Sequence, residues 1–194
     1  MKSIFLAAAV AIAASASVPA QAQMPGLVGS QHIGLTVPDV DDASAFFVEV
    51  LGCKRFFEIG PFGPFEDDWM TENLNVHPRA VAERLVFIRC GNGPAMELFK
   101  YVSPDQETVQ PKNSDIGGYH VAFYVDDMAA AVAYLRENGV KVLADAHRID
   151  EGPLGGLEWV YFLAPWGMQM ELVSSPTGLG YESTMPGRLW DPRF

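Results

Sequence analysis

The chain has 194 residues, enough to bury one good core or two small modules packed together. Apolar residues make up 49% of it and no low-complexity block is present, which is typical of a globular protein. The formal net charge of −11 argues against nucleic acid or an anionic membrane as a partner, because both require a basic face. The net charge says little about a small-molecule substrate, because a few local arginines can dominate a pocket.

Residues 1–22 have the features of a cleavable signal peptide. Lys2 gives a short positive region, and an apolar, alanine-rich run follows from Ile4 to Val18. The small-x-small pattern of a signal peptidase site is present at residues 20–22, and the apolar run is too short and too rich in alanine for a comfortable membrane span. We therefore expect cleavage after Ala22, no membrane association after processing, and a periplasmic or secreted protein.

The first module, residues 23–103, is predicted to run strand, helix, strand, insertion, strand, strand. Period-two alternation marks its strands, and helical spacing of apolar residues marks its helix. The four strands are expected at Gln31–Val37, Lys54–Ile59, Arg84–Arg89 and Ala95–Val102. The helix is expected to begin at Asp39 or Asp41 as N-cap and to end at Gly52. Residues 62–78 form the insertion, with a short helical pattern inside it.

The second module, residues 116–175, repeats this order after a polar linker at 104–115. Its strands are expected at Tyr119–Val125, Glu158–Leu163 and Met168–Ser174, with an extended stretch at Val140–Ile149. Asp127 is expected to cap a helix that ends near Gly139. Residues 176–194, rich in Gly, Pro and polar residues, predict a tail that wraps over the surface or over a partner.

The two modules share a repeated pair of chemically active residues. Each first strand carries a histidine, His32 or His120, followed by Val five positions later and Asp seven positions later. Each last strand carries a Met-Glu-Leu triplet, with Glu97 in the first module and Glu171 in the second. The separation from His to Glu is 65 positions in the first module and 51 in the second, and the insertion accounts for the difference. Because both residue types recur at equivalent positions of the two modules, chance is a poor explanation for the presence of all four.

Two imidazoles and two carboxylates suit one divalent metal ion. Zn²⁺, Ni²⁺, Co²⁺ and Mn²⁺ all accept this ligand set, which leaves room for water or substrate. A lone buried histidine is usually a core residue, so it is the repeat that supports this assignment. Burying an unpaired Glu between Met and Leu costs several kcal/mol, which a metal ion would offset. We predict that His32, Glu97, His120 and Glu171 bind one ion.

These paired strands resemble the vicinal oxygen chelate superfamily, which includes glyoxalase I, methylmalonyl-CoA epimerase, extradiol dioxygenases and fosfomycin-resistance proteins. The resemblance covers Ser30 to Ser174. It implies an α+β fold of two tandem βαβββ modules, whose strands form a curled mixed sheet around a metal cup. Ligands come from the first and last strand of each module, which match the four residues above. Members form this site within one chain or between swapped chains, and the sequence leaves open whether a homodimer forms.

The resemblance also implies a metal-dependent enzyme, an isomerase or lyase of the glyoxalase or epimerase kind. Such an enzyme abstracts a proton next to a carbonyl of a small α-hydroxycarbonyl substrate. Glu171 matches the general base, and Glu97 would lie on the opposite face, so that two bases permit epimerisation. Residues 60–79 further resemble a subgroup of epimerases of hydroxylated cyclic ketones.

Two other functions remain open at this stage. An extradiol-type dioxygenase holds Fe(II) with two His and one carboxylate, here His32, His120 and Glu171. Glu97 departs from that pattern, because a fourth protein ligand fills a position that O₂ chemistry needs. A non-catalytic small-molecule-binding protein of the same superfamily typically lacks the metal ligands, and this chain keeps all four.

Three further residues are candidates for substrate binding. His77 lies in the insertion and could reach over the cup, although an ordinary loop histidine is the alternative. Trp69 could form part of an apolar lid, or only fix the insertion to the core. Arg84 could bind a carboxylate or phosphate, but alternation places it off the face of Leu85 and Phe87, which indicates a solvated position.

The two cysteines, Cys53 and Cys90, lack the spacing of metal ligands. An oxidising compartment permits a disulfide between them. Two separate, small buried residues are an equally good interpretation, because the sequence gives no distance between them.

Overall fold

The computed structural model of the protein describes residues 24–194, so the predicted signal peptide and its cleavage site lie outside the described residues. The chain divides into two compact units, and the second, Gln31–Phe194, contains every strand and helix described below. Residues 24–30 contain one turn and no regular element. Within residues 24–194, no helix is long and apolar enough to cross a membrane.

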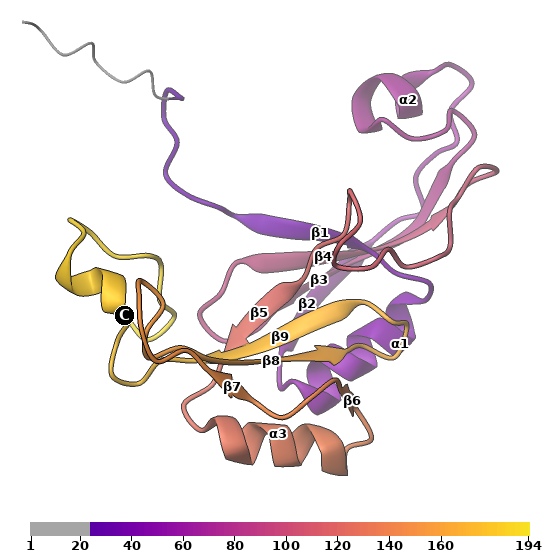
Figure 1. Ribbon diagram of the computed structural model, residues 1–194. Coiled ribbons are helices and arrows are strands. Elements are labelled where there is room, and N and C mark those ends of the chain that lie inside the picture. Colours follow the sequence, from indigo (N-terminus) through magenta and orange to yellow (C-terminus); the bar gives the residue numbers. More distant parts are fainter. Residues whose placement is uncertain (1–23) are drawn as a thin grey trace, which may run out of the picture. The chain divides into compact units, whose positions relative to one another are not determined.

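The first sheet is four-stranded, with the order β1-β4-β3-β2 (Figure 1). Its strands are β1 (His32–Thr36), β2 (Lys54–Ile59), β3 (Val81–Arg89) and β4 (Ala95–Val102). β1 runs parallel to β4, and the other pairs are antiparallel. Helix α1 (Val40–Ala45) continues into a π-helical turn, η1 (Phe46–Val50), and packs against β3 and β4. Asp39 caps α1, because its carboxylate accepts the backbone N–H groups of Asp41 and Asp42.

The second sheet repeats this plan, with the order β5-β9-β8-β6 and β7 paired to β8. Its strands are β5 (Val121–Tyr124), β6 (Lys141–Val142), β7 (His147–Arg148), β8 (Glu158–Leu163) and β9 (Gln169–Ser174). β5 runs parallel to β9, as β1 does to β4. Helix α3 (Met128–Glu137) is capped by Asp127, which accepts the N–H of Ala130. The predicted α+β fold with mixed sheets is thereby confirmed, and the sheets do not close into a barrel.

The structure changes some of the predicted boundaries. β5 begins at Val121 and not at Tyr119, because the chain turns just before it, where the N–H of Gly118 donates to the carbonyl of Asp115. His120 therefore precedes the strand. The stretch 140–149 contains two short strands, and β3 begins at Val81, three residues before its predicted start. The insertion holds helix α2 (Trp69–Leu74), and the tail holds the short 3₁₀ helix η2 (Gly180–Ser183).

One face of each sheet packs into a shared hydrophobic core, and the helices cover that face. Alternate strand residues from both sheets are buried there, namely Leu35, Val86, Leu98, Val160, Met170 and Leu172. Phe46 and Phe47 of η1 join the two modules by packing on Trp166, with ring centroids 5.9 and 6.1 Å apart. Because side chains alternate along a strand, the residues between these point to the opposite face, which the core leaves open.

Cys53 and Cys90 form a disulfide, which answers a question that the sequence left open. Cys53 follows η1 and is 4% exposed, while Cys90 follows β3. The bond therefore ties the end of the helical segment to the end of a central strand, across 37 positions of sequence.

Removing this disulfide is expected to lower the free energy of unfolding by about 3 kcal/mol, because a cross-link over a loop of this length restricts the unfolded chain. The measurement is urea unfolding of the Cys53→Ala/Cys90→Ala variant against the oxidised wild type. Reduced wild-type protein is the control and is expected to match the variant. Equal urea midpoints for oxidised wild type and variant would contradict the stabilising role.

Candidate metal centre

The first His–Glu pair lies across two neighbouring strands of the first sheet. The Nε2 atom of His32 on β1 is 3.4 Å from Oε2 of Glu97 on β4. In the strand register Gly34 lies opposite Glu97, so no side chain covers the carboxylate from β1. The Glu97 side chain is 15% exposed and that of His32 is 46% exposed. The carboxylate is thus mostly shielded from water, whereas the imidazole can reach a ligand.

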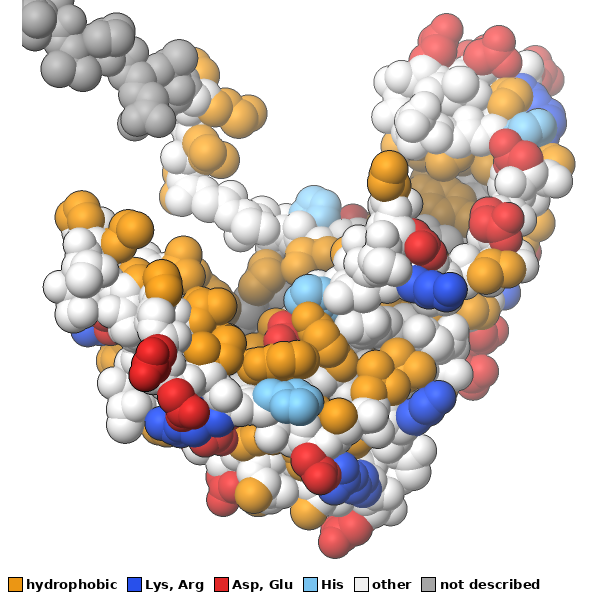
Figure 2. All heavy atoms as spheres, viewed as in Figure 1, with side chains coloured by type: hydrophobic (Ala, Val, Ile, Leu, Met, Phe, Trp, Pro, Cys, Tyr) orange, Lys and Arg blue, Asp and Glu red, His pale blue; other side chains and the backbone are white. Residues whose placement is uncertain are grey.

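The second pair has the same construction in the second sheet. The Nε2 atom of His120 is 3.2 Å from Oε2 of Glu171 on β9, with side chains 34% and 13% exposed. Ala122 lies opposite Glu171 in the register, the position that Gly34 has in the first sheet. Histidine side chains are visible next to acidic ones, with apolar side chains around them (Figure 2). The sequence duplication is therefore also a duplication of geometry.

Each histidine has an amide oxygen at its other ring nitrogen. Nδ1 of His120 is 3.0 Å from Oδ1 of Asn113, and Nδ1 of His32 contacts Oε1 of Gln31. Because an amide oxygen only accepts, Nδ1 carries the proton and donates it. In a neutral imidazole Nε2 then has only a lone pair, and this lone pair faces the carboxylate. Two acceptors in this position require a proton or a metal ion between them.

The spacing of each pair fits a metal ion. Two atoms bound to one ion at about 2.0–2.2 Å lie about 3.0–3.5 Å apart at tetrahedral or octahedral angles. The distances of 3.4 and 3.2 Å within the pairs fall in that range. A hydrogen bond from Nδ1–H to a neighbouring acceptor is also the usual companion of a metal-binding histidine. Each pair would supply one imidazole and one carboxylate, two of the four ligands predicted from the sequence.

The two halves are not brought together. Within residues 24–194 no group of three or more His, Cys, Asp or Glu side chains lies close enough to hold one ion. The structure therefore assembles the four predicted ligands as two pairs on two sheets. Their combination into one site remains a prediction.

A tyrosine accompanies each carboxylate on the open faces. Burial, and secondarily the charge of Glu97, raise the pKa of Tyr101. Burial and the charge of Glu171 likewise raise the pKa of Tyr161, while the amide of Asn113 lowers it. Burial also raises the pKa of Glu171 itself, against the opposing effect of His120. Both phenols are hence neutral hydrogen-bond donors at physiological pH, and Glu171 is a stronger base than an exposed carboxylate.

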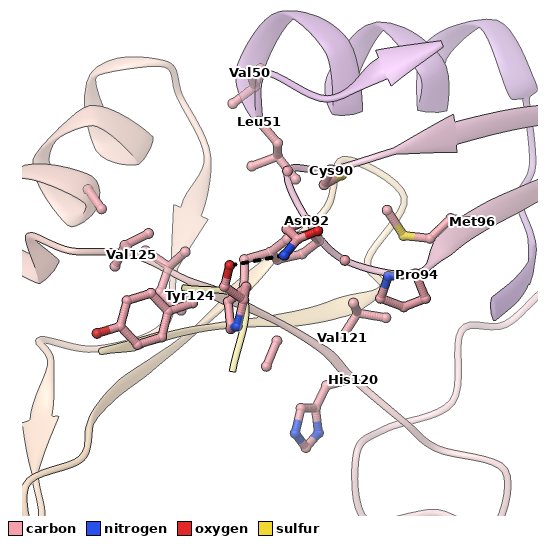
Figure 3. Close-up of a pocket in the computed structure, with 18 of the residues that line it drawn as sticks. Val50, Leu51, Cys90, Asn92, Pro94, Met96, His120, Val121, Tyr124 and Val125 are labelled. Atoms are coloured by element: carbon pink, nitrogen blue, oxygen red, sulfur yellow. Dashed lines mark hydrogen bonds between the residues drawn. The ribbon is translucent and has the colours of Figure 1, made fainter. Parts of the chain in front are cut away.

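His120 also borders a pocket of about 710 Å³, lined by η1, the 90–94 turn, β5 and the tail. Most of its lining residues are apolar (Figure 3). The side-chain amide of Asn92 donates to the backbone carbonyl of Pro192 over 3.4 Å, which holds the tail against this pocket. This contact concerns one residue of the tail, and whether the tail as a whole wraps over the surface or over a partner stays a prediction.

Arg84, a predicted substrate-binding residue, is bound to other side chains. Its guanidinium donates to Asp41 over 2.6 Å and to Glu58 over 2.7 Å. These hydrogen bonds lower the pKa of both carboxyl groups below their usual values. The pairing connects α1, β2 and β3, so Arg84 has a structural role here, and its contact with a substrate stays a prediction.

His77 and Trp69 both belong to the insertion, which is held by its own contacts. Nδ1 of His77 accepts the backbone N–H of Arg79 over 3.0 Å, and Trp69 packs edge-on against Phe65, with ring centroids 5.2 Å apart. The Arg79 guanidinium donates to the carbonyl of Asp67 over 2.7 Å. In residues 24–194 no hydrogen bond or ion pair joins the insertion to either His–Glu pair, so substrate binding by His77 and Trp69 stays a prediction.

Sequence reasoning missed Asn113 and Gln31. Asn113 lies in the segment predicted as a linker, seven positions before the histidine that it contacts. Nothing in the pattern indicates this contact, because it depends on the turn at residues 115–118. Gln31, directly before His32, had a positional signal, since it is the polar neighbour of a repeated residue.

Known epimerases are similar to this chain in sequence. The chain is 44% identical over 170 residues to 2-epi-5-epi-valiolone epimerase from Actinomyces sp, covering 87% of this chain and 91% of that protein. It is 29% identical over 120 residues to mitochondrial methylmalonyl-CoA epimerase from Mus musculus, covering 61% of this chain and 57% of that protein.

The fold is that of a glyoxalase family protein from Bacillus cereus, with a TM-score of 0.59 and 16% identity over 78% of this chain and 98% of the other. Residues 31–155 match the family model of the glyoxalase/bleomycin resistance protein/dioxygenase superfamily, which confirms the resemblance seen in the sequence. Two βαβββ modules, a repeated His–Glu pair and this match together show that the chain belongs to the glyoxalase/bleomycin resistance protein/dioxygenase superfamily.

Proposed function

We propose that the protein is an exported, metal-dependent epimerase of a small α-hydroxycarbonyl compound, with a hydroxylated cyclic ketone as substrate. One observation carries the proposal most directly: on each sheet, the Nε2 atom of a histidine lies 3.4 or 3.2 Å from an oxygen of a shielded carboxylate. The identity of 44% to an epimerase supports the reaction class. Export rests on the signal-peptide pattern of residues 1–22 alone.

The residues that would hold the ion are His32, Glu97, His120 and Glu171. Zn²⁺, Ni²⁺, Co²⁺ and Mn²⁺ are compatible with two imidazoles and two carboxylates. A bound divalent ion would polarise the carbonyl oxygen of the substrate, which makes the neighbouring C–H more acidic. The amide oxygens of Gln31 and Asn113 accept at Nδ1, which would leave Nε2 of each neutral imidazole free to bind the ion.

The proton transfer is assigned to the two glutamates. Glu171 takes the proton from the carbon next to the carbonyl, and burial, which raises its pKa, brings its basicity closer to the working pH. Glu97 stands on the other sheet and returns a proton from the opposite side of that carbon. The result is inversion at one carbon without net oxidation or reduction. The neutral phenols of Tyr161 and Tyr101 are available to hold substrate hydroxyl groups.

The equivalence of the two pairs favours an epimerase over a dioxygenase. A dioxygenase of this superfamily needs one carboxylate ligand and open positions for O₂. Here Glu97 is as closely paired and as well shielded as Glu171, so no feature of the geometry sets it apart as a non-ligand. A binding protein without catalysis has no use for two shielded carboxylates that each lie beside a histidine.

Whether one chain or two chains supply a complete set of ligands is decided by complementation. A mixture of His32→Ala and Glu171→Ala protomers, refolded together, regains one intact site per dimer if the site is shared. The same mixture keeps the weakened metal affinity of the single variants if each chain forms its own site.

The wild type is expected to bind one equivalent of Zn²⁺, Ni²⁺, Co²⁺ or Mn²⁺, because two His–Glu pairs make one ligand set. His120→Ala is expected to lose tight binding, since it removes one imidazole and leaves Glu171 unpaired. Metal content by elemental analysis and affinity by calorimetry are the measurements. His77→Ala is the matched control, with affinity equal to the wild type, and a wild type that takes up no metal would refute the site.

Replacing Glu171 by Gln is expected to reduce proton abstraction by at least about 100-fold, in line with the loss of a general base. The measurement is exchange of solvent deuterium into hydroxycyclohexanone, followed by NMR with metal content determined in the same sample. In Glu97→Gln, exchange is expected to persist while inversion is lost. Full exchange in Glu171→Gln would assign the base to Glu97 or His77 instead.

Replacing Asn113 by Ala is expected to weaken metal binding by about 10- to 100-fold, because His120 loses the acceptor that fixes its ring and tautomer. Calorimetric titration with Zn²⁺ measures this effect. Asn73→Ala removes an amide that bonds only to a helix carbonyl and serves as the control. An unchanged affinity in Asn113→Ala would show that the amide does not orient His120.

A further inference from the structure

Three aromatic side chains continue the second His–Glu pair across the open face of the second sheet. The Tyr161 ring lies edge-on to His120 and to Trp159, with centroids 5.2 Å apart in both cases. The Trp159 ring then lies over His147, with centroids 5.0 Å apart and an interplanar angle of 35°. We call Tyr161, Trp159 and His147 the aromatic strip. It extends from the proposed base to the outer strand β7.

The strand register places this strip beside Glu171 and away from the core. Tyr161 lies directly opposite Glu171, and Trp159 lies opposite Val173 on one side and His147 on the other. The residues on either side of Tyr161 along β8, Val160 and Phe162, are fully buried on the other face. Trp159 and Tyr161 are themselves partly exposed, so the strip is not part of the core.

The hydrogen-bonding groups of the strip are a phenol, an indole N–H and an imidazole, and the strip contains no lysine, arginine or carboxylate. The nearest charged neighbours along these strands, Arg148 and Glu158, bind each other over 2.9 Å and alternate to the opposite face. A phosphate or a carboxylate is bound most strongly by arginine or lysine, and the strip contains neither. An uncharged ring with hydroxyl groups fits it, because C–H groups pack on aromatic faces and hydroxyl groups bond to the phenol and the indole.

Two rigid aromatic side chains also distinguish a ring from an open chain. A ring presents a preformed flat face, whereas an open-chain polyol must lose conformational freedom to make the same contact. Ala122, on the other side of Glu171, has too small a side chain to compete for that space. A substrate ring on the strip would hold its reacting carbon next to Glu171.

We propose that the aromatic strip binds the ring of a neutral, cyclic, polyhydroxylated substrate and makes the site selective for cyclic over open-chain hydroxyketones. The effect of the aromatic strip on substrate selectivity rests on the proposed epimerase function. The binding of a ring to the strip does not depend on that function. Trp159 is the residue that sets the selectivity, because it contacts both other members of the strip.

Binding is tested without chemistry by using a ligand that has no carbonyl. Saturation-transfer NMR is expected to show that the wild-type protein binds myo-inositol. The same measurement with glycerol, an open-chain polyol, is expected to show weaker binding. In Trp159→Ala the affinity for myo-inositol is expected to fall roughly 3- to 10-fold, the magnitude of one aromatic contact, and Trp159→Phe is expected to restore most of it. Phe56→Ala removes an aromatic side chain that is 62% exposed on β2 and is the control.

Selectivity is tested by the deuterium exchange of hydroxycyclohexanone and of hydroxyacetone. The ratio of their kcat/KM values is expected to fall in Trp159→Ala and to remain unchanged in Phe56→Ala, with near-ultraviolet circular dichroism confirming that both variants are folded. If metal-loaded wild type exchanges deuterium into neither ketone, the proposed epimerase function is refuted. The binding of myo-inositol would still test the aromatic strip independently. No inositol binding to the wild type, or equal binding in Trp159→Ala, would refute the strip as a ring subsite.

Discussion

The central physical constraint is the meeting of two hydrogen-bond acceptors. When an amide oxygen fixes the proton of a neutral histidine at Nδ1, its Nε2 atom and a carboxylate oxygen 3.2–3.4 Å away are both acceptors, and a proton or a metal ion has to lie between them. The arrangement occurs in both modules, from equivalent strands and beside an equivalently small residue. A single pair could be an ordinary ion pair with a protonated histidine. The repetition, with an amide in place each time, is what supports the proposed metal ligand set.

Because side chains alternate along the strands, the fold can carry these His–Glu pairs without disturbing its core. Inward residues such as Leu35 and Leu172 build the core, so the outward residues on the same strands are not needed for core packing. Shielding a carboxylate in such a position destabilises the protein unless it is paired. The disulfide, the Arg84 network and the helix caps stabilise the same modules at sites remote from the open faces.

The sequence predicts much of the fold and the identity of the paired residues. The reason is that the repeated His and Glu positions can be recognised along the chain without knowledge of the three-dimensional structure. His32, Glu97, His120 and Glu171 were found in this way, and the pairing of each His with its own module's Glu agrees with strand neighbours. Asn113 and the aromatic strip could not be found. Their roles depend on a turn and on the register between β7 and β8, which local patterns do not encode. Arg84 shows the converse, since a residue that looked available for substrate is engaged by Asp41 and Glu58.

The claim that both pairs bind one ion is tested most directly by X-ray absorption spectroscopy of the protein loaded with one equivalent of Zn²⁺. The prediction is a first shell of nitrogen and oxygen at about 2.0–2.2 Å with scattering from two imidazoles. That scattering should fall to one imidazole in His32→Ala and also in His120→Ala. A shell with no imidazole, or one that either variant leaves unchanged, would contradict a metal site built from both modules.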